Sequence, residues 1–155
     1  MPRLFAAALA SIMLMSTTTS FAEQKSGTIE VFKSASCGCC NGWVKHLKQS
    51  GYTVNATNTA AGILAKIKRD AGLKPDLQSC HTGKVAGYVI EGHVPAQDVA
   101  RLLAEKPDAV GLTVPGMPLG SPGMDTGPDK EPYEVLLVKK DGSTEVFARH
   151  QQDAR

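Results

Sequence analysis

Residues 28–33 alternate between polar and apolar side chains, which is the pattern of a β-strand with one buried face. The period then changes, because Trp43, Val44 and Leu47 recur at the spacing of one face of a helix. Gly51 follows that stretch, and glycine is common directly after the last turn of a helix. The folded part of the chain is therefore predicted to begin with a strand and a helix.

The same succession of elements is predicted twice more. Residues 52–56 predict a second strand, and apolar positions at helical spacing predict a second helix over residues 63–72. Residues 84–90 predict a third strand, and Pro95 opens a third helix over residues 95–103. Alternation of this kind predicts a parallel or mixed sheet with helices packed on it.

The glycine- and proline-rich residues 111–128 break this alternation. Such a stretch alone would indicate a flexible linker. After it, however, residues 133–139 and 144–148 flank Asp141-Gly142, a strong signal for a β-hairpin. Because the hairpin must complete the same small sheet, we expect a long loop inside one domain, and such loops are commonly functional.

The predicted fold class is α/β, a single domain with a central mixed sheet and the element order βαβαβα, loop, ββ. A C-x-x-C sequence follows the first predicted strand, which makes this a thioredoxin-like arrangement. In that fold an X-Pro peptide bond that faces the cysteines is cis, and Val114–Pro115 is the candidate here.

The N-terminus has the pattern of a secretory signal peptide. Arg3 precedes an apolar stretch, and Ser20-Phe21-Ala22 is a cleavage site of small residues. The prediction is a signal peptide over residues 1–22 and a domain over residues 23–155, with its core at about 28–149; an uncleaved anchor is the alternative. No later segment approaches the roughly 20 apolar residues of a transmembrane helix, so no membrane insertion is expected after signal removal.

The net charge of the chain gives no reason to expect a charged polymer as partner, whereas its cysteine and methionine residues are candidate metal ligands. The chain has 17 basic and 15 acidic residues, and a formal net charge of +2 gives no reason to expect nucleic acid, an acidic polymer or an anionic membrane. Beyond the predicted signal peptide the chain keeps its four cysteines but only the methionines Met117 and Met124. Methionine normally fills cores, yet both of these lie in the predicted loop.

Three of the four cysteines stand together as Cys37-Gly38-Cys39-Cys40, at the predicted junction of strand and helix. Cys37 and Cys40 have the spacing of a dithiol redox centre, whereas Cys37 and Cys39 have a spacing that suits two thiolates on one soft metal ion. A helix N-terminus stabilises thiolates for either use. Structural disulfides are the alternative, but a bridge within four residues constrains the unfolded chain little, and at most one of the three can reach Cys80.

Further soft ligands lie in three later stretches of the chain: Cys80 with His81, then His93, then Met117 and Met124. Taken alone, Cys80 could be a small buried residue and His93 a loop histidine that helps to cap a helix. His46 is expected to have a structural role within a helix, and His150 is expected in a frayed tail. Neither of the last two is a predicted ligand.

Thiolate, thioether and imidazole ligands together select Cu(I), whereas zinc rarely takes a thioether, and a zinc knuckle would need a second ligand pair. The competing interpretation is a thiol oxidoreductase in which Cys37 attacks and Cys40 resolves the mixed disulfide. That chemistry leaves Cys39, Cys80 and His93 without a role. Copper binding accounts for more residues, and one site could serve both, because two cysteines could form a disulfide as copper changes oxidation state.

Four stretches in fixed order resemble the CopG-like periplasmic proteins found with bacterial copper-resistance systems, whose domain was long catalogued as one of unknown function: residues 37–43, 79–82, 87–95 and 114–124. The resemblance implies a thioredoxin-like fold, a periplasmic location and a copper site built around the C-x-C-C motif. It carries over the motif cysteines and four further shared positions: Cys37, Cys39 and Cys40, with Cys80, His93, Met117 and Met124. His81 could orient a sulfur ligand without binding copper itself.

The predicted function is a periplasmic copper-binding protein that supports copper resistance and holds Cu(I) in this Cys/His/Met site. The donors outnumber the needs of a single three- or four-coordinate Cu(I), so more than one copper per chain is predicted, with Cu(I)/Cu(II) cycling as an extension. A binding protein is favoured over an enzyme, and a thiol-disulfide oxidoreductase using Cys37 and Cys40 is the alternative. Expected partners are copper ions and other periplasmic copper-handling proteins.

Overall fold

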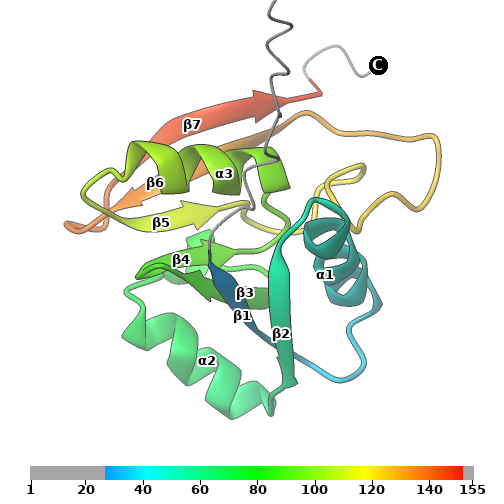
Figure 1. The fold of residues 1–155 in the computed structure, drawn as a ribbon, viewed down its shortest axis with the longest axis horizontal. Helices are drawn as coiled ribbons and strands as arrows, with labels where there is room; N and C mark the ends of the chain where they lie inside the picture. Colours follow the sequence, from blue (N-terminus) through cyan, green and yellow to red (C-terminus); the bar gives the residue numbers. More distant parts are fainter. Residues whose placement is uncertain (1–26, 152–155) are drawn as a thin grey trace, which may run out of the picture.

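The computed structural model describes residues 27–151 (Figure 1). The predicted signal peptide, residues 1–22, lies outside the described residues and stays a prediction. The elements follow one another as β1 (Thr28–Lys33), α1 (Gly38–Gln49), β2 (Thr53–Asn58), α2 (Ala61–Asp70), the 3-10 turn η1 (Pro75–Leu77), β3 (His81–Val85), β4 (Tyr88–Glu91), α3 (Ala96–Glu105), β5 (Ala109–Thr113), β6 (Tyr133–Lys139) and β7 (Thr144–His150). Within residues 27–151, no helix has the length and apolar character needed to cross a membrane.

The seven strands of residues 27–151 form one mixed sheet in the order β2-β1-β3-β4-β5-β6-β7. The pairs β1–β2 and β4–β5 are parallel, and each is joined by a crossover helix, α1 or α3. The remaining four pairs are antiparallel. The predicted α/β class and the single domain with a central mixed sheet are therefore confirmed.

Helices cover both faces of this sheet (Figure 1). On one face, Trp43 of α1 and Val99 of α3 share the larger apolar core with Ile90 of β4. Because side chains alternate across a strand, the neighbour Val89 points to the other face, where it packs with Leu77 of η1 in a second, smaller core. The helix α2 lies on this second face, through contacts described below.

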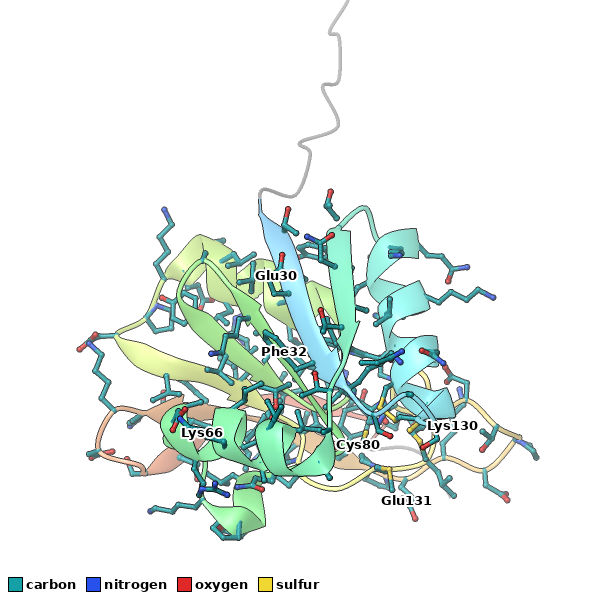
Figure 2. All side chains as sticks on the ribbon, turned by 90° about the horizontal axis from the view of Figure 1, so that it is seen from below. Glu30, Phe32, Lys66, Cys80, Lys130 and Glu131 are labelled. Atoms are coloured by element: carbon teal, nitrogen blue, oxygen red, sulfur yellow. A yellow bond between two sulfur atoms is a disulfide. The ribbon has the colours of Figure 1, made fainter. Side chains whose placement is uncertain are left out.

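Part of the second face stays open over β1. Glu30 lies there and accepts a hydrogen bond from the side chain of Asn55, and the ammonium group of Lys84 sits 5.9 Å from the ring centroid of Phe32. Figure 2 shows Glu30 and Phe32 along β1, with Cys80 near the end of the strand. Cys80 thus lies at one end of the sheet, away from the solvent-exposed part of this face.

The structure corrects the third predicted strand. Residues 84–90 are not one strand but the parts of a hairpin, β3 and β4, with Ala86 and Gly87 between them. Both residues have positive φ, 48° and 86°, which is the backbone conformation of a tight hairpin turn. Alanine adopts positive φ less readily than asparagine or glycine, so the sequence lacks the usual hairpin signal here.

The structure also corrects the start of the long loop. The predicted loop over residues 111–128 begins after Thr113, because Ala109–Thr113 forms β5 between β4 and β6. The element order is therefore βαβαββαβ, loop, ββ, and differs from the predicted order by these two strands. The candidate cis bond Val114–Pro115 is trans, since no peptide bond among the described residues is cis.

Candidate metal centre

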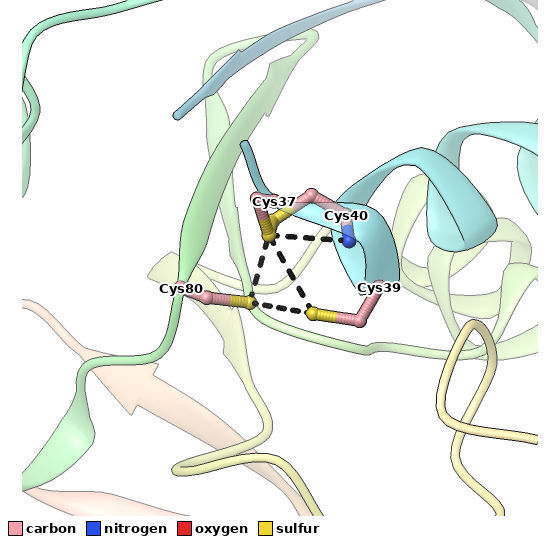
Figure 3. A group of neighbouring side chains, drawn as sticks. All are labelled: Cys37, Cys39, Cys40 and Cys80. Carbon is pink, nitrogen blue, oxygen red and sulfur yellow. Dashed lines mark hydrogen bonds between the residues drawn. A yellow bond between two sulfur atoms is a disulfide. The ribbon is translucent and has the colours of Figure 1, made fainter. Parts of the chain in front are cut away.

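Four cysteine sulfur atoms meet at one end of the sheet (Figure 3). Three come from the N-cap and first turn of α1, and the fourth comes from the residue directly before β3. The Sγ atoms of Cys37, Cys39, Cys40 and Cys80 all lie within 4.8 Å of one another. The sequence prediction that the C-x-C-C motif and Cys80 belong to one cluster agrees with this geometry.

The pairing of two antiparallel strands brings these distant residues together. β1 and β3 lie side by side with Lys33 opposite His81. The end of β1 therefore meets the start of β3, so that the chain leaving β1 for Cys37 passes the chain that arrives at Cys80. The 42 residues between Cys37 and Cys80 contain α1, β2, α2 and η1, which return the chain to the same end of the sheet.

Cys37 and Cys40 form a disulfide, whereas Cys39 and Cys80 are free thiols. Cys37 is the N-cap of α1, and its Sγ accepts a hydrogen bond of 3.3 Å from the backbone N–H of Cys40. Cys40 is fully buried, while Cys37 and Cys39 are half-buried. The motif thus places an exchangeable disulfide at a helix N-terminus, where unpaired N–H groups stabilise a thiolate.

Two buried imidazoles flank the sulfur of Cys80. Its Sγ lies 3.3 Å from Nδ1 of His81 and 3.3 Å from Nε2 of His93. Both rings are fully buried, and His81 also packs against Trp43 with ring centroids 4.4 Å apart. Cys80, His81 and His93 therefore form a second group of potential ligands that shares Cys80 with the four-sulfur group.

The orientation of His93 is set by the backbone of the long loop. Its Nδ1 lies 2.8 Å from the carbonyl oxygen of Pro122, so Nδ1 carries the proton and Nε2 is free to accept from Cys80. The Nε2 atom of His81 is buried without a hydrogen-bond partner among the described residues. Such an orphan nitrogen is uncommon in a protein interior and is suited to a ligand that the chain does not supply.

Burial sets the protonation states of these groups. Burial, with a smaller contribution from Cys39, raises the pKa of the Cys80 thiol to about 11. Burial, reinforced by the electrostatic effect of the neighbouring His93 and Lys68, lowers the pKa of His81 to about 3. The pKa of His93 is also lowered by burial. In the absence of metal the site therefore holds a neutral thiol between two neutral imidazoles.

The loop that carries Met117 and Met124 passes beside the cluster. The hydroxyl of Ser79 donates to the carbonyl oxygen of Gly116, directly before Met117. At the other end, Gly123 packs against the first turns of α1, where a Cβ on it would meet the carbonyl oxygen of Cys39 at 2.5 Å. Met117 is 52% exposed and Met124 is half-buried. The backbone next to both methionines is thus held at the site, and ligation by their sulfur atoms stays a prediction.

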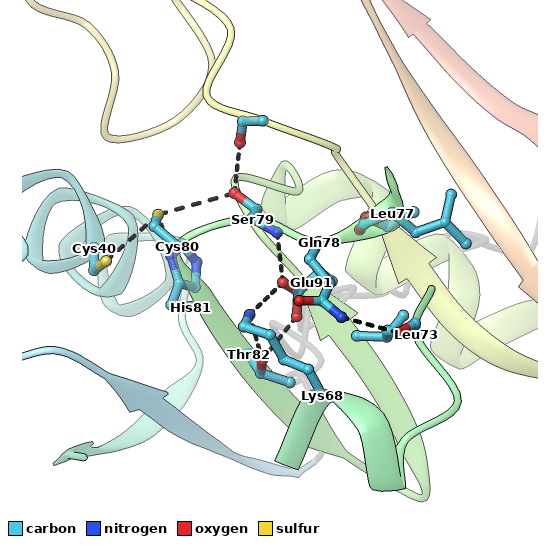
Figure 4. A network of polar contacts seen from close by, with 12 residues as sticks. Cys40, Lys68, Leu73, Leu77, Gln78, Ser79, Cys80, His81, Thr82 and Glu91 are labelled. Carbon is cyan, nitrogen blue, oxygen red and sulfur yellow. Dashed lines mark hydrogen bonds and ion pairs between the residues drawn. The ribbon is translucent and has the colours of Figure 1, made fainter. Parts of the chain in front are cut away.

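A buried ionic network behind Cys80 was not predicted (Figure 4). Lys68 of α2 forms an ion pair with Glu91 of β4, and the exposed fractions of the two side chains are 5% and 0%. Glu91 also accepts from the backbone N–H of Ser79 at 2.7 Å and from the hydroxyl of Thr82 at 2.7 Å. Burial raises the pKa of Glu91 against the opposing effect of Lys68. The network fixes the backbone directly before Cys80.

The two histidines that were not predicted as ligands lie outside the cluster. His46 accepts a 3.0 Å hydrogen bond from the N–H of Ala96, so it connects α1 to the start of α3. His150 ends β7, where it bonds Asp98 at 2.7 Å and stacks on Tyr133, so it does not belong to a frayed tail. Both line an open surface cavity of about 410 Å³ that is separate from the cysteines.

Two solved structures are similar to this chain. The first, described as "Copper resistance protein copG- Form 1", is 41% identical with a TM-score of 0.74, and the match covers 79% of this chain and 96% of that chain. The second, described as "Copper resistance protein copG- Form 2", is 40% identical with a TM-score of 0.74, and the match covers 80% and 98%. The chain belongs to the CopG-like copper-resistance family.

A family model described as "Protein of unknown function, DUF411" matches residues 77–124. That segment of the family domain contains Cys80, both buried histidines and both loop methionines, and it ends before the C-terminal hairpin. The C-x-C-C motif precedes this segment. No curated protein matches this chain.

Proposed function

We propose that the protein binds copper, mainly as Cu(I), and supports copper tolerance in the periplasm. The observation that carries the proposal is the position of Cys80, whose sulfur lies within reach of the three motif sulfurs and of two buried imidazoles. Soft thiolates combined with imidazole favour Cu(I), and Met117 and Met124 would add thioether ligands that zinc rarely takes. The similarity to two copper resistance proteins supports the same metal.

More than one copper per chain follows from the sharing of Cys80. A four-sulfur group and a Cys80-His81-His93 group meet at this single sulfur. A thiolate can bridge two Cu(I) ions, and each ion needs only three or four ligands. We therefore include Cys37, Cys39, Cys40, Cys80 and His93 as ligands of a multinuclear site, with Met117 and Met124 completing it from the loop.

The location and the finer fold class are part of the proposal. Cleavage after Ala22 would release residues 23–155 into the periplasm. The strand order β2-β1-β3-β4, with α1 between β1 and β2 and the cysteines at its N-terminus, supports a thioredoxin-like first half. β5, β6 and β7 would then be an extension of that sheet.

The second candidate function is thiol-disulfide exchange with another protein, and the Cys37–Cys40 disulfide at the N-terminus of α1 favours it. Copper binding and disulfide exchange would be linked by oxidation of the Cys37 and Cys40 thiolates. Two thiolates that each give one electron to Cu(II) would form this disulfide and yield two Cu(I) ions. We favour copper binding as the main role, because exchange through Cys37 and Cys40 leaves the buried His81 and His93 unused.

Anaerobic titration of the reduced protein with Cu(I) against a competing chelator tests the proposal. We expect more than one Cu(I) per chain, and a Cys80→Ser variant should bind fewer ions with an affinity at least about tenfold lower, because the shared sulfur is lost. A Met117→Leu/Met124→Leu variant should keep the cluster and lose affinity only for the ion that the loop completes.

Two outcomes would contradict the proposal in different ways. A stoichiometry of one copper that Cys80→Ser leaves unchanged would reject the multinuclear site. Absence of copper binding, together with reduction of a protein disulfide by Cys37, would assign the protein to the second candidate function. A His46→Gln variant is the matched control, because His46 lies outside the cluster and should leave copper binding unchanged.

A further inference from the structure

Lys33, the last residue of β1, is buried although its side chain carries a charge. The residue is 6% exposed. Its Nζ donates to Oδ1 of Asn58 at 2.9 Å and to the carbonyl oxygen of Ser34 at 3.3 Å. Both acceptors are uncharged, and Lys33 forms no ion pair within residues 27–151. Lysine is almost never this deeply buried unless a group of opposite charge accompanies it.

The other buried lysine of the described residues shows the usual arrangement. Lys68 is 4% exposed, and its ammonium group forms an ion pair with Glu91. The sequence around Lys33 offers no such partner, because no aspartate or glutamate occurs between Glu30 and Asp70. Glu30 itself lies on the open face of the sheet, and the alternation of side chains along β1 places Lys33 on the opposite face. The charge of Lys33 is therefore uncompensated.

Lys33 lies at the end of the sheet where the cysteines meet. It pairs with His81 of β3, and paired residues of two antiparallel strands point to the same face. The carbonyl oxygen of Ser34 that accepts from Nζ also accepts from the backbone N–H of Cys37 at 3.2 Å. A single carbonyl oxygen thus connects the ammonium group to the N-cap of α1. The helix N-terminus and Lys33 together place positive charge on this side of the cluster.

Binding of Cu(I) brings negative charge to the same place. Cysteine binds copper as a thiolate, and two thiolates with one Cu(I) form a group with one negative charge in excess. The site has four cysteine sulfurs, so the cluster stays anionic until it holds as many Cu(I) ions as thiolates. Thioether and neutral imidazole ligands leave this balance unchanged. A cation buried beside such a group attracts it strongly, because water screens the two charges little.

We propose that Lys33 is the counter-ion of the copper–thiolate cluster. Its charge lowers the stability of the metal-free protein and favours the binding of the first Cu(I) ions, whose thiolate complexes are anionic. Lys33 is not a ligand in this role and acts on the cluster through its charge. The inference rests on the proposed copper binding, and its test distinguishes the failure of one from the failure of the other.

Three substitutions separate the charge of Lys33 from its hydrogen bonds. Lys33→Met removes both, Lys33→Gln removes the charge and keeps an N–H donor, and Lys33→Arg keeps the charge. The loss of the donor leaves no acceptor stranded, because Asn58 is exposed and the carbonyl of Ser34 keeps the N–H of Cys37. Lys45→Met is the matched control, since Lys45 is exposed on α1 and its substitution changes the net charge equally.

Anaerobic titration of each reduced protein with Cu(I) against bathocuproine disulfonate measures the affinity for the first equivalent of copper. We expect Lys33→Met and Lys33→Gln to lower this affinity about tenfold or more, and Lys33→Arg to recover most of it. Lys45→Met should stay within about twofold of the wild type, because its charge is screened by solvent. Equal affinities of Lys33→Gln and the wild type, or equal losses in Lys33→Arg and Lys33→Met, would overturn the proposal.

Urea denaturation of the same proteins, metal-free and reduced, gives a readout that distinguishes the counter-ion from a structural residue. A buried charge without a partner costs free energy, so Lys33→Met should unfold at an equal or higher urea concentration than the wild type while it binds Cu(I) more weakly. A lower unfolding midpoint together with weaker binding would assign Lys33 a structural role and overturn the proposal.

The wild-type titration separates this inference from the proposed function. Copper binding that is unchanged in all three Lys33 variants would overturn the counter-ion alone. A wild-type protein that binds no Cu(I) would overturn the proposed function and the counter-ion with it.

Discussion

His81 lies at the centre of the site with its ring between Trp43 and His93, at centroid distances of 4.4 Å and 5.0 Å. Its Nδ1 faces Cys80, and its Nε2 has no partner among the described residues. Burial, helped by nearby cationic groups, lowers its pKa to about 3. The ring therefore stays neutral and keeps a lone pair available at neutral pH.

This pKa makes the stability of the metal-free protein depend on pH. In the unfolded chain His81 binds a proton below its ordinary pKa of about 6.5, whereas in the folded protein it stays neutral down to about 3. The unfolded state is therefore favoured as the pH falls through this window. We expect the free energy of unfolding to drop by about 2 kcal/mol between pH 6.5 and pH 5, and the lowered pKa of His93 adds to the same trend.

Chemical denaturation of the metal-free protein at several pH values measures this effect. A His81→Leu variant should show a shallower pH dependence, because one of the two titrating rings is removed. Because burial raises the pKa of Glu91 and so opposes this trend, the comparison with His81→Leu decides: an equal pH dependence of the two proteins would contradict the assignment of a neutral, buried His81.

Among single residues, the sequence reveals those of rare, ligand-forming types and does not reveal charged residues of common types that become buried in the fold. Cys80 and His93 stand out because soft ligands are rare beyond the C-x-C-C motif, and both lie in the cluster. Lys68 and Glu91 do not stand out, because lysine on an amphipathic helix and glutamate at a strand end are usually solvated. Their burial becomes visible only when α2 packs over β4.

Lys68, one of the two buried residues of α2, connects this helix to the sheet through its ion pair with Glu91. A Lys68→Met variant would leave the buried carboxylate without its cation, although Ser79 and Thr82 still donate to it. Removing one partner of a buried pair is expected to cost about 3 kcal/mol or more of unfolding free energy. Denaturation with urea, followed by circular dichroism, measures the loss.

The same helix supplies a matched control. Lys66 forms an ion pair with Asp70 one turn along α2, but the two side chains are 67% and 58% exposed. Lys66→Met should therefore change stability by less than about 1 kcal/mol. A Lys68→Met/Glu91→Leu variant, which removes both charges, should regain much of the lost stability. Equal effects of Lys66→Met and Lys68→Met would show that the pair is not buried in solution.

The contact between α1 and the long loop depends on the absence of a side chain at Gly42. A Cβ there would lie 2.8 Å from the Cα of Gly123, which is backbone and cannot rotate away. We expect Gly42→Ala to destabilise the protein by about 1 to 3 kcal/mol through displacement of the loop, even though alanine is the better helix former.

Gly38→Ala is the control for this prediction, because a Cβ at Gly38 meets no atom within 4 Å, and Gly38 lies in the first turn of the same helix. Its effect should stay within about 0.5 kcal/mol. Equal stabilities of the two alanine variants, measured by urea denaturation, would show that the loop does not press on α1.

The helices and strands that the sequence predicts best are those in which apolar residues recur at a clear helical or strand spacing, or which flank a strong turn signal. β1, α1 and the hairpin of β6 and β7 lie at or near their predicted positions, because alternation, helical spacing and Asp141-Gly142 are strong local signals. The β3–β4 hairpin is missed, since its turn residues Ala86 and Gly87 interrupt an apolar run without the usual signature. β5 is missed because five residues before a proline-rich loop carry little periodic signal, and its place in the sheet comes from long-range pairing.

Across the whole molecule, one apolar core joins both halves of the sheet. Ile29 of β1, Trp43 of α1 and Leu137 of β6 belong to the same buried cluster, which indicates a single cooperative unit. Trp43 is the only tryptophan, is fully buried, and donates through Nε1 to the carbonyl oxygen of Val94 at 2.8 Å. Its fluorescence therefore reports on the half that carries the cysteines.

We expect urea denaturation followed by Trp43 fluorescence to coincide with denaturation followed by far-ultraviolet circular dichroism, which reports on all the helices and strands. Coincident transitions are the result expected of a two-state domain. A fluorescence transition at clearly lower urea would mean that the part around α1 unfolds before β5, β6 and β7, contrary to a shared core.

Lys33 of β1 pairs with His81 of β3. The site therefore depends on the register of these two strands as well as on the identity of its residues. Side chains of a strand alternate between faces, so a shift of one residue in this pairing would turn His81 away from Cys80 and towards α2. A one-residue insertion within His81–Val85 could thus leave every proposed ligand in the sequence and still abolish the site. The loop between Asp125 and Glu131 is exposed and should accept an insertion of the same size, so we expect a change of length to be tolerated in that loop and not within β3.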